Sequence, residues 1–294
     1  MFKILITGAK GQLGSEIRQI QNNFPDFCFI FTDIKELDIT KFSDINLFYK
    51  KHKFDFIVNC AAYTNVDKAE TDFENAYKIN AQAVKNLSEI SKEYKIPLIH
   101  ISTDYVFDGK SNIPYTENEK VNPQSVYGKT KLKGEEFAKD AYNHIIIRTS
   151  WLYSSFGNNF LKTMIKLGKE RESINVVADQ IGSPTFAGDL ALAVIQIIKK
   201  ISVKEVRNIS GIYHYSNEGS CSWYEFAKEI MKESKINCKV NPIPTQDYPT
   251  PAKRPKFSLL DKTKIKKTFG VAVPFWKDSL KVCINSLLNF ESDN

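Results

Sequence analysis

The sequence contains little cysteine and little arginine, and each shortage excludes a class of protein. Its five Cys are dispersed, odd in number and without a CxxC pair, at positions 28, 60, 221, 238 and 283. This excludes a disulfide framework and indicates a reduced, cytoplasmic protein. Only five Arg stand among the 41 basic residues, which are scattered along the chain and accompanied by 34 acidic ones. The net charge of +7 therefore indicates Lys-rich solvated faces rather than a groove for nucleic acid.

Long apolar runs and metal-ligand spacings are also missing. The longest apolar stretches, such as 190–198, fall far short of the roughly 20 residues that span a membrane, so no membrane association is expected. The four His have no ligand spacing and no Cys joins them, which argues against zinc. The first residues lead straight into a strand pattern, so no signal peptide is expected. With 42% hydrophobic and 26% charged residues, the composition is that of an ordinary globular protein.

A glycine-rich segment has the pattern of a dinucleotide site. It reads TGAKGQLG (7–14), follows the strand-like FKILI (2–6) and leads into a helical stretch at 12–22. Its three glycines allow the backbone to turn tightly and approach a pyrophosphate, which the helix N-terminus then stabilises. The GxxGxxG spacing is typical of short-chain dehydrogenases. The cofactor contacts predicted in this turn are Gly8, Lys10, Gly11, Gln12, Leu13 and Gly14.

An acidic residue, Asp33, follows the second apolar strand at 27–32. A carboxylate there suits the hydroxyls of the adenosine ribose. It would accept from the 2′-OH and repel a 2′-phosphate, while Lys10 and Lys35 would offset that repulsion. The sequence therefore predicts a preference for NADH that does not exclude NADPH. Further cofactor contacts are predicted at Asp38, Ile39, Ala61, Ala62 and Tyr63.

A Tyr and a Lys one helical turn apart follow the hydroxyls of a strand end. The apolar run 97–101 ends in Ser102-Thr103, and Tyr127 and Lys131 come later. The i,i+4 spacing places phenol and ammonium on one helix face, where the ammonium can lower the pKa of the phenol from its usual value of about 10. Two other Tyr-x-x-x-Lys pairs occur, at 49/53 and 224/228, so the pair alone means little. Only the pair at 127/131 has the strand-end hydroxyls and the nucleotide signature before it.

We therefore predict that Thr103, Tyr127 and Lys131 are catalytic residues of a hydride-transfer site. The Thr103 hydroxyl would hydrogen-bond the reacting carbonyl oxygen, and the Tyr127 phenol would donate the proton. Lys131 would hold the nicotinamide ribose and favour the phenolate that remains after proton transfer.

Strand and helix patterns alternate through the first half of the chain. Further strands are expected at 55–59, 97–102 and 144–148, and helices near 41–52, 72–94 and 125–141. Continuous apolar strands alternating with helices indicate a parallel sheet covered on both faces, an α/β fold of the doubly wound Rossmann type. Ligands of such sheets bind beyond the carboxyl ends of the strands, where the glycine turn, Asp33, 59–62 and 102–103 all fall.

The pattern loosens after Thr149. Helices are expected near 158–169, 188–200, 222–234 and 276–289, with short strands near 174–177 and 212–215. We predict an NAD(P)-binding Rossmann domain at 1–150 and a smaller α/β substrate-binding lobe at 151–294, with sheet and helices partly shared. Five prolines between 241 and 261 predict an extended, non-helical stretch. It is either a surface linker or a binding loop, and the sequence leaves both open.

Seven blocks, spread over the whole chain, resemble the extended short-chain dehydrogenases and, within them, the dTDP-4-dehydrorhamnose reductase family. The blocks of residues 7–14 and 126–135 (VYGKTKLKGE) are shared by many short-chain dehydrogenases. STDYVFDG, TSWLY and DQIGSPT are more specific to the reductases. In chain order the blocks are TGAKGQLG, VNCAAYTNVDKAE, HISTDYVFDG, VYGKTKLKGE, RTSWLY, DQIGSPT and RPKFSLLD.

The resemblance implies reduction of the C4 keto group of dTDP-4-dehydro-L-rhamnose by NADH or NADPH, which yields dTDP-L-rhamnose for cell-surface polysaccharide. The partner would be the dTDP-sugar, and the chain would act as a monomer or a homodimer. Arg254 suits the diphosphate, whereas Trp151 would contact the sugar or else simply fill the core. The implied substrate-binding residues are Thr103, Asp104, Tyr105, Tyr127, Trp151, Asn159, Gln180 and Arg254.

Other functions remain to be weighed against this one. Related nucleotide-sugar dehydratases carry Asp-Glu after the active-site Thr, whereas Asp104 and Tyr105 stand here, so elimination lacks its second carboxylate. A regulator of methionine adenosyltransferase shares the fold without catalysis, but the intact trio favours an enzyme. A reductase of another nucleotide 4-keto-6-deoxy sugar stays open. Some relatives hold Mg²⁺ between subunits; Glu16 fits that pattern and 188–189 only partly, so a metal is possible but not expected.

Overall fold

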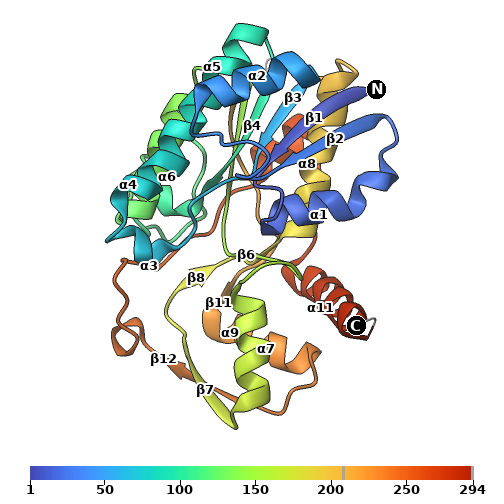
Figure 1. Ribbon diagram of the computed structural model, residues 1–294. Helices are drawn as coiled ribbons and strands as arrows, with labels where there is room; N and C mark the ends of the chain where they lie inside the picture. The colour runs from blue at the N-terminus through green and yellow to red at the C-terminus, as the bar shows by residue number, and fades with distance from the viewer. Residues whose placement is uncertain (207–208, 293–294) are drawn as a thin grey trace.

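Six parallel strands form the central sheet of the protein, whose computed structural model describes residues 1–206 and 209–292. The order β10-β5-β4-β3-β1-β2 places β1 in the interior, beside the strand that ends in Asn59. This confirms the predicted parallel α/β sheet. Figure 1 shows the sheet in the upper part of the molecule, with the smaller lobe below it. The strands are β1 (Phe2–Thr7), β2 (Phe27–Thr32), β3 (Phe56–Asn59), β4 (Leu98–Thr103), β5 (His144–Thr149) and β10 (Gly211–His214).

Both faces of this sheet are buried because its strands are apolar on both sides. Ile4 and Ile6 join a core with α1 and α8, whereas Leu5, which points the other way, joins a core with α2 and α5. The continuous apolar runs in the sequence follow from this double burial. The helices around the sheet are α1 (Gln12–Ile20), α2 (Phe42–His52), α3 (Val66–Ala69), α4 (Phe73–Tyr77), α5 (Ala83–Tyr94), α6 (Val126–Ala138) and α8 (Ala187–Ser202).

The helix expected over 72–94 is interrupted by a π-helical turn, Lys78–Gln82. The turn carries Asn80, whose Oδ1 accepts from the Tyr63 amide at 2.8 Å and whose Nδ2 donates to the Thr130 hydroxyl at 3.1 Å. Single π turns often mark functional positions. This one joins the loop after β3 to the helix that carries Tyr127 and Lys131.

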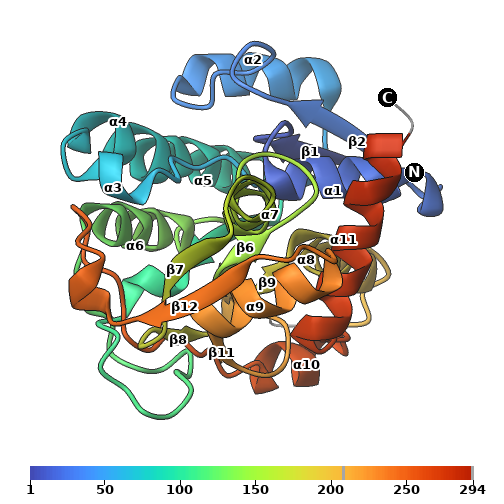
Figure 2. The ribbon, with the colours of Figure 1, turned by 90° about the horizontal axis from the view of Figure 1, so that it is seen from below.

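In the part of the chain that the structure describes, the smaller lobe contains three two-stranded pairs and the helices that cover them. β7 and β12 are parallel and run side by side in Figure 2, where the lobe faces the viewer. Apolar side chains of α7, α9 and α11 form its core. Its elements are β6 (Leu152–Tyr153), α7 (Phe160–Glu170), β7 (Ser173–Val177), β8 (Ile181–Gly182), β9 (Thr185–Phe186), β11 (Cys221–Ser222), α9 (Trp223–Glu233), β12 (Lys239–Ile243) and α11 (Trp276–Ser292). The remaining helix, α10 (Thr263–Phe269), packs instead against β10 and α8 of the first lobe.

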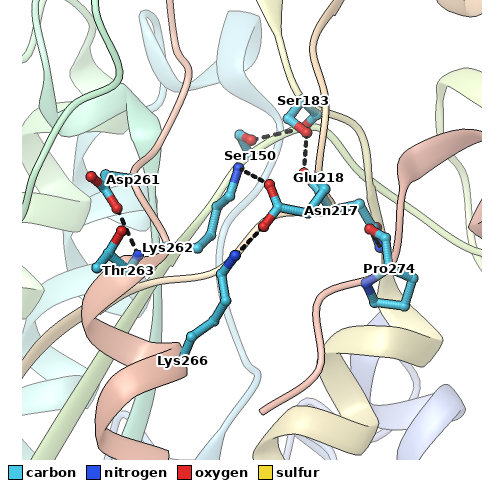
Figure 3. Close-up of polar contacts among 9 residues, drawn as sticks. All are labelled: Ser150, Ser183, Asn217, Glu218, Asp261, Lys262, Thr263, Lys266 and Pro274. Atoms are coloured by element: carbon cyan, nitrogen blue, oxygen red, sulfur yellow. Dashed lines mark hydrogen bonds and ion pairs between the residues drawn. The ribbon is translucent and has the colours of Figure 1, made fainter. Parts of the chain in front are cut away.

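The second half of the chain also completes the first lobe. β10 is the edge strand of the central sheet, and α8 packs against α1. Figure 3 shows how the segment after β10 is tied to α10, since Glu218 pairs with Lys262 at 3.3 Å and also with Lys266. The domain boundary at residue 150 stays a prediction. No helix within the described ranges has the length and apolarity to cross a membrane.

The proline-rich segment begins in β12 and is mostly irregular after it, but the expectation that it contains no helix is wrong at one turn. Thr245–Asp247 forms a 3₁₀ helix directly after Pro244. A proline is tolerated there because the N–H groups at the start of a helix have no hydrogen-bond acceptor within the helix. Pro242 lies in β12, where a two-stranded pair leaves an open edge.

Candidate active site

A cavity of about 870 Å³ opens at the carboxyl ends of the central strands and is lined by both halves of the chain. This is the size of a small-molecule site and the expected place in an open α/β sheet. Seventeen of the predicted site residues line it: Gly8, Gly11, Gln12, Leu13, Asp33, Asp38, Ile39, Ala61, Ala62, Thr103, Asp104, Tyr105, Tyr127, Lys131, Trp151, Asn159 and Arg254.

Four other predicted residues are outside this lining, and each has a structural task. A Cβ on Gly14 would lie 2.6 Å from the Gly8 carbonyl oxygen, so this glycine lets α1 pack on the loop. The Lys10 backbone N–H donates to Asp33 at 3.1 Å. The Tyr63 hydroxyl donates to Asp72 at 3.0 Å, and the buried Gln180 amide donates to Thr245 at 3.2 Å.

The glycine turn forms a cradle that fits a dinucleotide diphosphate. Gly8 has φ +64°, and a Cβ there would lie 2.6 Å from the backbone of Ala61. Gly11 caps α1 without a side-chain hydrogen bond, and no acidic residue lies in the first turn of the helix. Both features are what a pyrophosphate site at this turn requires, and the site itself stays a prediction.

Asn159 joins this cradle to the smaller lobe. Its Nδ2 donates to the Gln12 side chain at 3.0 Å and to the Ser154 carbonyl at 2.7 Å, while its Oδ1 caps α7 through the Lys162 amide. Gln12, which is predicted to bind the cofactor, and Asn159, which is predicted to bind the substrate, thus contact each other directly. Both of them line the cavity.

Thr103 and Tyr127 come together at the end of β4. The Thr103 hydroxyl donates to Asp104 at 2.9 Å, and it also lowers the pKa of the Tyr127 phenol. Tyr127 stands in the first turn of α6, which Ser125 caps by accepting from Gly128 at 3.1 Å. Because Gly128 has no side chain, the first turn of α6 packs directly against the Tyr105 carbonyl, where a Cβ would have no room.

Lys131 lies one turn further along α6, with 1% of its surface exposed. Its Nζ donates to the Ile101 carbonyl at 2.7 Å. Burial lowers the pKa of Lys131 to about 8, against the opposing charge of Glu135. The expected lowering of the Tyr127 pKa by Lys131 is not found: burial raises the pKa of Tyr127, and the Thr103 hydrogen bond only partly opposes this. Desolvation outweighs the effect of Thr103, and the charge of Asp104 adds to the rise, so the phenol carries its proton, as a proton donor must.

Arg254 brings the proline-rich segment to the cavity. Its guanidinium pairs with Asp67 at 2.6 Å and donates to the Tyr105 hydroxyl at 3.2 Å. Burial raises the pKa of Tyr105 and raises that of Asp104 to about 6. Because Arg254 is part of the lining, the structure favours the binding-loop interpretation of this segment over a simple linker.

Known proteins resemble this chain over nearly its whole length. The family described as RmlD substrate binding domain matches residues 2–289. A dTDP-4-dehydrorhamnose reductase of Aggregatibacter actinomycetemcomitans is 42% identical over 288 residues, which cover 96% of this chain and 98% of the relative. This chain belongs to the dTDP-4-dehydrorhamnose reductase family.

Solved structures of this reductase family have the same fold. The enzyme of Clostridium acetobutylicum superimposes with a TM-score of 0.91 at 46% identity, covering 98% of this chain and 100% of that one. The Bacillus anthracis reductase, solved in complex with NADP, gives a TM-score of 0.91 at 40% identity, covering 97% and 100%.

Sequence reasoning missed an aromatic wall that this member of the reductase family places in the cavity. Trp223 stacks on Trp151 with ring centroids 3.5 Å apart and planes 7° from parallel, and Phe160 packs against Trp223 at 4.6 Å. Gly182 makes room for the Trp151 ring. The TSWLY block identified Trp151, but no local signal pairs it with a residue 72 positions later, at the start of α9.

The acidic residues considered for Mg²⁺ make hydrogen bonds within the chain. Glu16 accepts from the Ser154 hydroxyl at 2.6 Å, and Asp189 accepts from the Asn217 amide at 2.6 Å and from Ser279. Burial raises the pKa of both carboxyls. Across residues 1–206 and 209–292 no group of three His, Cys, Asp or Glu could hold a metal ion.

Proposed function

We propose that this chain reduces the C4 keto group of dTDP-4-dehydro-L-rhamnose to dTDP-L-rhamnose, the last step of dTDP-rhamnose biosynthesis. The observation that carries the proposal is one cavity that joins the glycine cradle, the trio Thr103, Tyr127 and Lys131, and the guanidinium of Arg254. A reductase of this substrate needs all three: a dinucleotide, a proton donor at the carbonyl, and a cation for a diphosphate.

The cofactor would be NADH or NADPH, bound by the glycine cradle and Asp33. When bound, it supplies the hydride that reaches the C4 carbon. The Thr103 hydroxyl, which donates to Asp104 in the structure, turns to donate to the carbonyl oxygen as negative charge grows there, and Tyr127 gives that oxygen a proton. Lys131, whose pKa of about 8 keeps it mostly protonated at neutral pH, stabilises the phenolate that remains.

The substrate end of the cavity is supplied by the second half of the chain. Trp151 and Trp223 offer a flat apolar wall to the sugar, and Arg254 offers its planar fork to the diphosphate. Asp104 is the single carboxylate next to Thr103, with Tyr105 after it. One proton donor suffices for reduction, whereas elimination requires an acid and a base.

The test is a coupled assay that contains dTDP-glucose, its 4,6-dehydratase, its 3,5-epimerase and this protein. We expect NADH or NADPH oxidation that depends on all four components, with dTDP-L-rhamnose as the product. Replacing dTDP-glucose by UDP-glucose, with a matching dehydratase, tests the nucleotide. A protein that binds NADH but never oxidises it would instead fit a non-catalytic dinucleotide-binding regulatory subunit.

Cofactor choice should depend on Asp33, whose carboxylate is held in place at the end of β2. Oδ1 accepts from the Ile34 amide at 2.8 Å and Oδ2 from the Lys10 amide at 3.1 Å. We expect Asp33→Ala to shift the ratio of kcat/KM for NADH over NADPH towards NADPH, because the residue that repels a 2′-phosphate is gone. Asp26→Ala, at the exposed start of the same strand, should leave the ratio unchanged. An unaltered ratio in Asp33→Ala would show that another residue reads the ribose.

Substrate affinity should depend on Arg254. We expect Arg254→Ala to raise KM for the nucleotide sugar about 10- to 100-fold, the value of one or two charged hydrogen bonds, with NADH affinity nearly intact. The matched control is Lys253→Ala, which removes the same charge from an exposed neighbour in the same loop. Equal loss of both ligands would point to a folding defect and contradict the assignment.

A further inference from the structure

The loop of residues 248–255 leaves the smaller lobe and ends against the first lobe at Asp67. In Figures 1 and 2 this part of the chain, drawn in orange, lies beside α3. Asp67 Oδ1 accepts from the Ala252 amide at 3.2 Å, and Oδ2 pairs with the Arg254 guanidinium at 2.6 Å. One carboxylate therefore holds the loop through its backbone and its side chain together.

The two ends of the loop are anchored elsewhere. Before it, the Thr245 amide and hydroxyl both donate to Asp179, at 2.9 and 2.6 Å. After it, Lys256 and Ser258 bond to the backbone of Ile181 at 2.8 and 2.9 Å. These anchors belong to the smaller lobe. Between them the loop is held to the first lobe by the Asp67 contacts, by the hydrogen bond of Arg254 to Tyr105, and by the close approach of Pro255 to Gly109.

The Asp67–Arg254 ion pair is poorly suited to a stabilising role. Its side chains are 35% and 27% exposed, and pairs that reach solvent to this extent contribute little to the free energy of folding. Its geometry, in contrast, is specific. One terminal nitrogen of Arg254 faces Asp67 and the other faces the Tyr105 hydroxyl, which fixes the plane of the guanidinium at the cavity wall. The five N–H donors of an Arg exceed these two contacts, so donors remain for an anion.

We propose that Asp67 is a positioning residue: it holds the loop of residues 248–255 over the substrate end of the cavity and orients Arg254 towards the diphosphate of the nucleotide sugar. The inference rests on the proposed function for the identity of that ligand. Without Asp67 the loop and the Arg254 side chain have to be ordered when the substrate binds, and this ordering weakens binding. The chemistry at Thr103 and Tyr127 is left as it was.

The experiment compares Asp67→Ala, Arg254→Ala and the double variant. Two quantities are measured: KM for the nucleotide sugar in the coupled assay, and Kd for dTDP by calorimetry on the NADH-loaded protein. We expect Asp67→Ala to raise both about 3- to 10-fold, as for one side chain that must be ordered on binding, with kcat and NADH affinity unchanged. Asp67→Asn, which keeps an acceptor for Ala252, should fall between. Glu74→Ala, which removes an exposed acid from neighbouring α4, should have no effect.

The double variant separates positioning from a direct effect of charge. If Asp67 acts through Arg254, Asp67→Ala adds nothing to Arg254→Ala. Two results would overturn the proposal. One is that Asp67→Ala raises Kd for dTDP by the same factor in the wild type and in Arg254→Ala, and the other is that Kd for dTDP falls when the negative charge is removed. Failure of the proposed function looks different: wild type then binds dTDP without turning over the sugar, and the Kd series still decides the role of Asp67. A wild type that does not bind dTDP overturns both.

Discussion

Replacing Tyr127 by Phe is expected to lower kcat by about 10²- to 10⁴-fold, the range usual for loss of a general acid, while KM changes little. The phenol is buried, protonated because burial raises its pKa, and faces the same cavity as Thr103 at the end of β4. Phe keeps the ring and its edge-to-face contact with Tyr105, so the variant removes the proton donor and little else.

The measurement is steady-state turnover in the coupled assay, with NADH binding followed separately by fluorescence. Tyr224→Phe is the matched control, since Tyr224 also begins a Tyr-x-x-x-Lys pair, with Lys228 5.4 Å above its ring. Intact NADH binding with lost turnover supports the assignment. Near-normal turnover in Tyr127→Phe would assign the proton to Asp104, Tyr105 or water, and the mechanism proposed here would fail.

The largest loss of stability is expected from Glu135→Leu. Glu135 and Arg148 have side chains 0% and 2% exposed and make a two-pronged ion pair at 2.8 and 2.7 Å. Ser102 donates to the same carboxylate at 2.6 Å. Removing one partner leaves a buried charge without its counter-charge, which costs about 3–5 kcal/mol of unfolding free energy. The network also lies one turn from Lys131 and next to Thr103, so turnover should fall with stability.

Denaturant unfolding checks this expectation. Glu136→Leu makes the same change one residue later at a half-exposed pair with Lys133, and should cost under about 1 kcal/mol. Adding Arg148→Met to Glu135→Leu should recover most of the loss, because a buried pair can be replaced by apolar side chains of similar volume. If Glu135→Leu is no less stable than Glu136→Leu, the ion pair is not what holds α6 to β4 and β5.

The strands of the central sheet could be predicted because their signal is local. β1 to β5 lie within about a residue of the ranges expected from continuous apolar runs, and such runs arise wherever a strand is buried on both faces. The glycine turn could also be predicted, because Gly8 has a positive φ that other residues rarely adopt and its position therefore favours glycine. The π turn at Lys78–Gln82 was missed because its cause, Asn80 bonded to Tyr63 and Thr130, depends on residues 17 and 50 positions away.

The residue pattern alone showed which chemical groups stand at the strand ends and which helix carries Tyr127 and Lys131. The protonation of these groups, in contrast, depends on how the folded chain buries them. Burial, which no local pattern encodes, raises the pKa of Tyr127 against the expectation from the i,i+4 spacing. The partners of Arg254 and Trp151 were likewise decided in three dimensions, because Asp67 and Trp223 lie 187 and 72 positions away along the chain. Contacts between residues so far apart in the sequence form only when the two lobes pack together. The burial that shifts the pKa of Tyr127 likewise results from packing.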